Sequence, residues 1–590
     1  MKQWNKEFTI LILAFTLCLG CSWGCSGFQK NGKVNDVTEY YDLPYYKGKD
    51  ADTIKHKLNL FVPNNVENPP ILLWIHGGAW AFGGRKFETD LARAFANEGI
   101  AVATISYRLS PGTWKNPKFD EGIQHPEHIK DVARSFAWVY QNAESYGYDQ
   151  NSIFVSGYSA GGHLSALLAM DPSYLFEVGM SVRDIRAAIP IAGAYDIAAY
   201  HESHLKYNGK DMAEKHVQAV FGNTEREHRR ASPTSYIDNQ WIPMLVISEK
   251  DTYGYTQLLE QEAGKANYET MEFYHIKDMG HSQLLQDLGK MDNSKYRSVV
   301  VDYIQKKKAD YSYLPMKDLK LAYKVFGAGE PLFILNGGPG FSSHNFASLA
   351  QNFSRDRLVV LFDQRGTGFS KLHGPQDSSL TIDLMVQDLE ALRKHLGLEK
   401  ITLFGQSFGG LYAMSYAAKY PDNVKAMILS HSAGMTMDFL STVDQRLMSR
   451  LDDEDKDVLA NLDSEENIDL RRMKRAKAIA GGYLYNQENR NRVFKGLAFN
   501  SRYHPEVNQS IWSDLRKTQY NVVDEMKQFA NPVLIIHGKN DIVAPEHAEA
   551  MHAVFPNSTL KLLSNCVHYG WLDAPDEYFG TVHKFLKDNG

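Results

Sequence analysis

The stretch Ile153-Phe-Val-Ser-Gly157-Tyr-Ser159-Ala-Gly161 decides the fold of the first half of the chain. A short, mostly apolar run leads directly into a Gly-x-Ser-x-Gly pattern, and a helical pattern follows. The glycines allow the sharp strand-to-helix turn that lifts a serine hydroxyl above the end of a sheet. Ser159 is therefore the candidate nucleophile of this half.

The same order of elements occurs a second time, where Ile401-Thr-Leu-Phe leads into Gly405-Gln-Ser407-Phe-Gly409. In both halves an apolar run that ends in a glycine cluster, and then a second apolar run, precede the serine motif. Such runs, alternating with helical patterns, predict buried parallel strands in a three-layer α/β fold. We interpret the chain as two fused, related domains, at residues 30–308 and 309–590.

Partners for Ser159 follow in the order nucleophile, acid, histidine. Residues 242–248 have the pattern of a strand, Asp251 lies just past its carboxyl end, and His281 comes later. Serine needs an imidazole to take its proton, and the imidazole needs a carboxylate to hold its tautomer. We predict a triad of Ser159, Asp251 and His281, with the backbone N–H groups of Gly77, Gly78 and Ala160 as its oxyanion hole.

The same reasoning gives the second half Ser407, Asp541 and His568, with Asp541 just past an apolar strand at residues 532–538. The chain between nucleophile and acid is longer here than in the first half. Its extra part is charged and rich in helical patterns, which predicts a cap over residues 432–525 that shapes the pocket.

Residues 50–305 resemble the hormone-sensitive-lipase-like carboxylesterases, including Bacteroidetes-type feruloyl and acetyl esterases. The resemblance rests on His76-Gly-Gly-Ala-Trp80, Tyr107-Arg-Leu-Ser-Pro111, His125-Pro126 with Asp131-Val-Ala133, and Gly157-Tyr-Ser-Ala-Gly-Gly-His163. It implies hydrolysis of short acyl or aryl esters, such as those that decorate plant polysaccharide. One departure is Ser248, which stands where relatives usually have glycine before the acid.

Residues 314–590 resemble the proline iminopeptidase family of α/β-hydrolases. The motifs are Gly337-Gly-Pro-Gly340, Asp363-Gln-Arg-Gly-Thr-Gly-Phe-Ser370 and Gly405-Gln-Ser-Phe-Gly-Gly410. The resemblance implies removal of an N-terminal residue, often proline, or hydrolysis of a related amide. It also implies oxyanion donors at the backbone N–H groups of Gly338 and Phe408. Asn336 and Phe408 stand where the family usually has His and Trp.

Together the two halves predict tandem α/β-hydrolase domains, the second with a helical cap. The hypothesis is a bifunctional serine hydrolase: a carboxylic ester hydrolase followed by an aminopeptidase-like or amidase-like hydrolase. Two alternatives stay open, namely that both domains are esterases or that one is a catalytically silent binding module. The acidic cap residues that could bind a substrate amine (Asp452–Asp455, Glu465, Glu466) are interpreted as solvated helix faces.

The first 25 residues have the order of a secretory signal peptide. Lys2 and Lys6 precede an apolar run at residues 8–19, and small residues follow. The run is too short for a membrane span. Leu17-Cys-Leu-Gly-Cys21 also resembles a bacterial lipoprotein signal, with a lipid anchor at Cys21. We predict an exported protein, periplasmic or an outer-membrane lipoprotein of a Gram-negative bacterium, whose only membrane contact is that anchor.

Charge and motifs exclude several other functions. Lys and Arg number 64 against 70 Asp and Glu, a net charge of −6, so no nucleic-acid footprint is expected. Two His-x-x-His pairs (His125 with His128, His201 with His204) have no further ligand cluster, so no metal is predicted. The segment Gly405–Gly410 lacks the Lys and Ser/Thr of a phosphate loop, and no cofactor is predicted. The expected partners are small ester, amide or peptide substrates and acylated polysaccharide.

Overall fold

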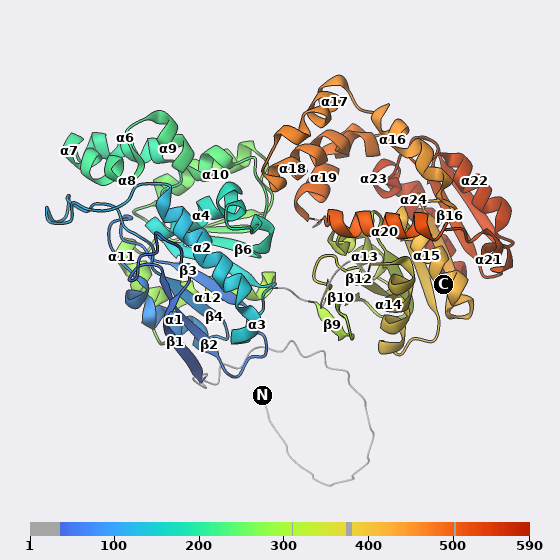
Figure 1. The fold of residues 1–590 in the computed structure, drawn as a ribbon, viewed down its shortest axis with the longest axis horizontal. Helices are drawn as coiled ribbons and strands as arrows, with labels where there is room; N and C mark the ends of the chain where they lie inside the picture. Colours follow the sequence, from blue (N-terminus) through green and yellow to red (C-terminus); the bar gives the residue numbers. More distant parts are fainter. Residues whose placement is uncertain (1–35, 309–310, 373–379, 501–502, 590) are drawn as a thin grey trace, which may run out of the picture.

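The computed structural model describes residues 36–308, 311–372, 380–500 and 503–589, and its two lobes each contain one β-sheet (Figure 1). The predicted signal peptide and lipid-anchor site lie outside the described residues. Within the described ranges, no helix is long and apolar enough to cross a bilayer.

The first sheet has eight strands in the order β1-β2-β4-β3-β5-β6-β7-β8. β1 and β2 pair antiparallel with their neighbours, and the pairs from β4 to β8 are parallel. The strands are β1 (Val37–Pro44), β2 (Lys57–Pro63), β3 (Ile71–Ile75), β4 (Ala101–Ile105), β5 (Ile153–Tyr158), β6 (Ala187–Ile191), β7 (Met244–Ser248) and β8 (Met271–His275).

The second sheet repeats this order from its second strand onward, as β10-β12-β11-β14-β15-β16-β17, with β13 and β9 added beside β10. The strands are β9 (Ser312–Pro315), β10 (Leu319–Phe326), β11 (Glu330–Leu335), β12 (Arg357–Phe362), β13 (Lys371–Leu372), β14 (Ile401–Gln406), β15 (Val424–Ser430), β16 (Val533–Gly538) and β17 (Ser558–Leu563). The predicted fold class, two mostly parallel sheets flanked by helices, is confirmed.

Helices cover both faces of each sheet, which explains why the strands are continuous apolar runs. Along β3, Leu73 packs with one core cluster and Trp74 with the other, on the opposite face. The first cluster includes α2 (Glu127–Gln141), α4 (Ala160–Met170) and α10 (Tyr253–Lys265). The opposite one includes α1 (Thr89–Asn97), α11 (His281–Leu288) and α12 (Lys295–Lys307).

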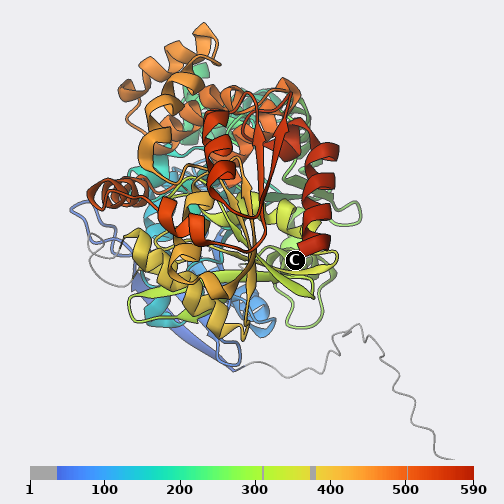
Figure 2. The ribbon, with the colours of Figure 1, turned by 90° about the vertical axis from the view of Figure 1, so that its right-hand side faces the viewer.

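The second domain has the same layers. One face carries α14 (Ile382–His395) and α15 (Phe408–Lys419), and the other carries α13 (Ala347–Phe353) and α24 (Pro575–Asn589). In Figure 2, which looks onto this domain, the red C-terminal helix α24 runs along one side of the sheet. α22 (Pro545–Val554) joins β16 to β17.

A helical insertion follows the equivalent strand in both domains (Figure 1). In the first domain it lies between β6 and β7, is smaller, and was not predicted. In the second it lies between β15 and β16, where the cap is predicted. The first comprises α6 (Ile197–Tyr207), α7 (Lys210–Met212), α8 (Ala219–Phe221) and α9 (Glu225–Ala231). The second comprises α16 (Leu440–Met448), α17 (Asp453–Ala460), α18 (Ile468–Ile479), α19 (Arg490–Lys495), α20 (Pro505–Lys517) and α21 (Val523–Gln528).

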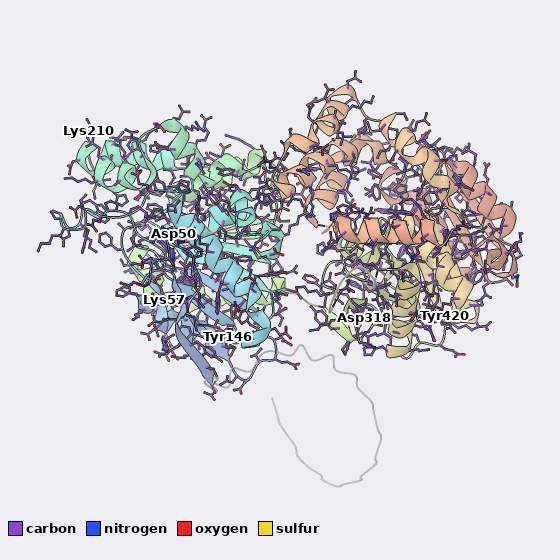
Figure 3. All side chains as sticks on the ribbon, viewed as in Figure 1. Asp50, Lys57, Tyr146, Lys210, Asp318 and Tyr420 are labelled. Atoms are coloured by element: carbon purple, nitrogen blue, oxygen red, sulfur yellow. The ribbon has the colours of Figure 1, made fainter. Side chains whose placement is uncertain are left out.

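The helices α6–α9 and α16–α19 lie on one side of the molecule (Figure 1 and Figure 3), where Lys210 marks the outer end of the first insertion, and Asp318 and Tyr420 mark the opposite end of the second domain. The second insertion also touches the first domain. Leu470 and Met473 of α18 pack against the core of that domain, and Ser181 Oγ donates to Asp469 Oδ2 at 2.9 Å.

Candidate active sites

Ser159 and Ser407 occupy the same strained backbone conformation between a strand and a helix. Their φ and ψ angles are 59° and −115° for Ser159, and 56° and −122° for Ser407. Non-glycine residues adopt such angles only where the surrounding structure imposes them. A Cβ on Gly161 would lie 1.9 Å from the carbonyl oxygen of Ile75, and one on Gly409 would lie 1.9 Å from that of Leu335. Each helix therefore starts tightly against the neighbouring strand, and each serine projects from the resulting elbow.

In the second domain the predicted acid and histidine are brought together. His568 Nδ1 lies 2.7 Å from Asp541 Oδ1, and both side chains are buried. The backbone N–H of Val543 donates to the same carboxylate oxygen at 3.1 Å. Burial alone would raise the pKa of Asp541, but the adjacent rings of His568 and His537 outweigh it and hold that pKa below its usual value. The charged carboxylate favours the tautomer of His568 that carries its proton on Nδ1.

Ser407 and His568 line one cavity of about 180 Å³ beneath the cap. The residues around it come from the oxyanion loop, the elbow, the cap and the turns that follow β16 and β17. They are Gly337, Gly338, Phe341, Ser342, Asn345, Phe346, Gln406, Phe408, Ala433, Phe439, Leu440, Val443, Tyr483, Leu497, Trp512, Ile542, Val543 and Tyr569.

The predicted oxyanion residues of this domain lie beside Ser407, the candidate nucleophile. Gly338 and Phe408 both line the cavity, and Phe408 is the first residue of α15, so its N–H has no helical acceptor. Asn336 holds the loop: its Nδ2 donates to the carbonyls of Gly337 and Phe341, both at 3.1 Å. Gln364 Nε2 in turn donates to the Asn336 carbonyl at 3.0 Å.

In the first domain the structure pairs the histidine ring with a different carboxylate from the predicted one. His281 Nδ1 lies 2.9 Å from Oε1 of Glu249, which is fully buried. Asp251, the predicted partner, instead accepts the backbone N–H of His281 at 2.8 Å through Oδ2. The reason is position: β7 ends at Ser248, so Glu249 is the first residue beyond the sheet, and Asp251 lies farther along the turn.

Two sequence signals could have identified Glu249. It is a carboxylate directly after a buried strand, where catalytic groups collect in such sheets. The departure at Ser248 also marked this turn as different from its relatives. The backbone N–H of Asp251 donates to Glu249 Oε2, so both acids belong to one network around His281.

The first oxyanion loop is built like the second. Gly77 lies against the elbow, because a Cβ on it would be 3.3 Å from Ser159 Cβ. His76 Nδ1 lies 2.7 Å from the Gly77 carbonyl, and Tyr107 Oη donates to the His76 carbonyl at 3.2 Å. Burial lowers the pKa of His76 to about 3, so this ring is a neutral structural donor. His76 and Tyr107 thus take the roles that Asn336 and Gln364 have in the second domain.

The remaining predicted oxyanion residues directly follow the elbow serine or the first loop glycine in the chain. Ala160 is the first residue of α4 and directly follows Ser159, and Gly78 follows Gly77 in the loop. Among the described residues, neither serine hydroxyl hydrogen-bonds to its histidine ring. Catalytic hydrogen bonds in structures without substrate are often long and tighten only when substrate binds.

An ion pair beside each oxyanion loop, partly buried in the first domain and buried in the second, extends the correspondence and was not anticipated from the sequence. Arg108 pairs with Asp131 of α2 at 2.8 Å, and Arg365 pairs with Asp388 of α14 at 2.6 Å. Each arginine directly follows the residue that braces the loop, Tyr107 or Gln364. The second arginine belongs to the Asp-Gln-Arg-Gly motif, so this motif ties the loop to its flanking helix.

The two His-x-x-His pairs and Cys566 have structural surroundings and no metal-binding arrangement. Over the residues that the structure describes, no three His, Cys, Asp or Glu side chains are grouped so as to hold a metal. His128 is buried against Ser110 Oγ at 2.9 Å, and His201 lies 3.0 Å from Gln218 Nε2. Cys566 is buried behind the second triad, its Sγ lies 3.3 Å from His431 Nε2, and burial raises the pKa of its thiol.

Comparisons with known proteins assign a family model to each domain. Residues 58–257 match the model BD-FAE, and residues 330–575 match the model of the alpha/beta hydrolase fold. These matches support a hydrolase in which both domains have the α/β-hydrolase fold. Its first domain is similar to the hormone-sensitive-lipase-like esterases, and its second is similar to the proline iminopeptidases.

Proline iminopeptidases from other bacteria align to about half of the chain. The proline iminopeptidase of Lactobacillus acidophilus is 26% identical over 296 residues, 47% of this chain and 97% of that protein. The proline iminopeptidase of Clostridium botulinum is 28% identical over 290 residues, 47% of this chain and 98% of that protein. A solved hydrolase from Pseudomonas aeruginosa, 22% identical, covers 47% of this chain and 98% of its own, with a TM-score of 0.37.

Proposed function

We propose that this protein is a bifunctional serine hydrolase with one catalytic centre in each domain. The observation that carries the proposal is the repeated constellation: a serine on a strained elbow, a glycine loop against it, and a histidine whose Nδ1 meets a buried carboxylate. Such an arrangement serves acyl transfer through a covalent serine intermediate.

The first centre hydrolyses carboxylic esters. Ser159 Oγ attacks the ester carbonyl while His281 Nε2 takes the serine proton, and Glu249 stabilises the imidazolium that forms. The N–H groups of Gly77, Gly78 and Ala160 bind the oxyanion. The histidine then protonates the departing alcohol, and water attacks the acyl-serine ester by the same route in reverse. The similarity to BD-FAE supports acyl or feruloyl esters, including those on plant polysaccharide, as its substrates.

The second centre uses Ser407, His568 and Asp541 in the same roles, with the N–H groups of Gly338 and Phe408 facing the oxyanion. The relatives named proline iminopeptidase support an aminopeptidase or amidase activity here. Apart from His568, the described residues that line the cavity are uncharged, which favours a second candidate, an esterase or amidase for acyl groups without a free amine.

The experiment that tests two-site catalysis compares Ser159→Ala, Ser407→Ala and the parent protein on p-nitrophenyl acetate, methyl ferulate and proline p-nitroanilide. We expect Ser159→Ala to remove the activity on methyl ferulate and Ser407→Ala to leave it intact. A protein in which neither substitution changes any activity is not a two-site hydrolase. If one substitution removes every activity, the domain that was not substituted is catalytically silent.

We also propose that residues 1–25 direct export and that Cys21 carries a lipid anchor in the periplasm or outer membrane of a Gram-negative bacterium. The order of charged, apolar and small residues supports this. Palmitate labelling of a tagged protein and its loss in Cys21→Ala test the anchor. Unlabelled protein released freely into the periplasm contradicts it.

A further inference from the structure

The cavity at Ser407 is lined by uncharged groups. Apart from His568, every described residue on its wall is apolar, glycine or an uncharged polar residue. Seven aromatic residues contribute to the lining. Three of them form one continuous wall, since Trp512 lies 5.5 Å from Phe408 and 6.1 Å from Phe439 between ring centroids.

Cap carboxylates are absent from the described lining of this cavity, and three of them are bound to other partners. Asp455 pairs with Arg490, Glu465 pairs with Lys474 at 2.9 Å, and Asp469 accepts from Ser181 of the first domain. Asp444, next to the lining residue Val443, is exposed to solvent. The buried acid Asp541, which lies behind the cavity, is bound to His568.

The charged cap group that contacts the triad is a cation. Arg446 Nε donates to the backbone carbonyl of Asp541 at 2.7 Å. When a substrate with a free α-ammonium next to its scissile bond binds, the ammonium group would lose its hydration. The described wall of the cavity offers it no negative charge in exchange. Burial of an unpaired charge is strongly unfavourable, whereas a neutral ring gains from the same desolvation.

The size of the cavity sets the size of the group that it holds. A cavity of roughly 150 Å³ lined by apolar side chains is known to hold one benzene ring. The cavity at Ser407 measures about 180 Å³ and opens onto the nucleophile. It therefore has room for a single five- or six-membered ring beside the scissile carbonyl.

We propose that the second site takes neutral, apolar acyl groups about the size of one ring and discriminates against acyl groups with a free α-ammonium. This inference rests on the proposed role of Ser407 as nucleophile. It makes the second domain an esterase or amidase for uncharged acyl donors, unlike an enzyme that removes an N-terminal residue.

Two boronic acids of matched shape test the inference on the full chain. Cyclopentylboronic acid and pyrrolidine-2-boronic acid both add to a catalytic serine, and their rings differ by one CH₂ that becomes an ammonium. The protein is incubated with increasing concentrations of each boronic acid and then labelled with a fluorophosphonate. Peptide mapping measures how much of Ser407 is labelled at each concentration. We expect the cyclopentyl compound to protect Ser407 at a concentration at least about tenfold lower.

The outcomes separate the inference from the proposed function. Equal or better protection by the pyrrolidine compound, or protection by neither compound, overturns the inference while Ser407 remains a reactive nucleophile. Absence of labelling at Ser407 before any boronic acid is added overturns the proposed function of this site as well.

A pair of isosteric variants tests the electrostatic cause. Val443→Asp adds a carboxylate to the wall, and Val443→Asn adds the same shape without the charge. We expect the aspartate variant to be protected by pyrrolidine-2-boronic acid at least about tenfold better than the asparagine variant. Equal protection of the two variants contradicts a preference set by charge.

Discussion

The ring Nδ1 of His281 lies 2.9 Å from Oε1 of Glu249, whose side chain is completely buried. The neighbouring Asp251 holds the backbone of the same histidine. The turn after β7 thus divides two tasks between two carboxylates: Glu249 orients the imidazole ring, and Asp251 holds the backbone at the start of α11.

This division predicts different effects for two conservative substitutions. Glu249→Gln removes the charge that stabilises the imidazolium, and we expect kcat on a p-nitrophenyl ester to fall by roughly 10²- to 10⁴-fold in a Ser407→Ala background. Asp251→Asn keeps an oxygen that can accept the His281 N–H, so kcat should fall by less than about tenfold. If Asp251→Asn proves the more damaging change, Asp251 and not Glu249 is the triad acid.

Asn336 and His76 brace equivalent loops through an atom at the same side-chain position. Nδ2 of Asn336 and Nδ1 of His76 each meet the carbonyl of the following glycine. We therefore expect His76→Asn to retain most of the ester hydrolysis of the first domain, whereas His76→Leu, which has no donor, should lower kcat at least about tenfold. Steady-state kinetics on methyl ferulate give the comparison, and an asparagine variant as inactive as the leucine variant would refute the equivalence of the two loops.

A substitution at the elbow of the second domain is expected to abolish the reactivity of Ser407 without affecting Ser159. A Cβ on Gly409 meets the Leu335 carbonyl at 1.9 Å, so Gly409→Ala must displace α15 from β11. Overpacking of this kind destabilises by about 1–3 kcal/mol, and fluorophosphonate labelling should disappear at Ser407 and persist at Ser159. Gly580→Ala is the matched control, because a Cβ there has no atom within 4 Å. Loss of labelling at both serines in Gly409→Ala would show that the two centres are coupled.

Glu88 makes the stability of the first domain depend on pH. Burial raises the pKa of this carboxyl from 4.5 to about 7, and the adjacent Trp74 indole offsets only part of the shift. Because the folded protein binds the proton more tightly than the unfolded chain, the free energy of unfolding falls as pH rises from about 4.5 to about 7 and then levels off. The total change is at most about 3 kcal/mol.

Glu88→Gln removes this titration while keeping the shape of the side chain. Denaturant unfolding at pH 5 and pH 8 should show a smaller loss of stability across that range in the variant than in the parent protein. Parallel pH profiles for the two proteins would place Glu88 in a hydrated environment and refute the assignment.

Much of the architecture follows from local sequence patterns. A strand buried on both faces needs apolar residues at successive positions, so β3, β5, β11 and β14 were visible as continuous runs. The elbows were visible because only glycine tolerates the approach of the next helix, as the contacts of Gly161 and Gly409 demonstrate. The order of motifs then placed His281, Asp541 and His568 at the carboxyl ends of the sheets.

Features that depend on the path of a turn, or on contacts between distant segments, could not be predicted from the sequence. Glu249 and Asp251 are two residues apart, and only the exit angle of β7 decides which carboxylate reaches the ring. The pairing of Arg108 with Asp131 joins separate elements whose distance the sequence does not encode. The uncharged cavity at Ser407 is assembled from cap and sheet segments far apart in the chain, so its charge could be judged only from the fold.

The central claim is that both serines are nucleophiles in one chain. Its most direct test is fluorophosphonate labelling of the intact protein, followed by peptide mapping and stoichiometry. The account predicts modification of Ser159 and Ser407, one equivalent each, with each label lost only in its own alanine variant. Labelling of a single serine, or of neither, contradicts it.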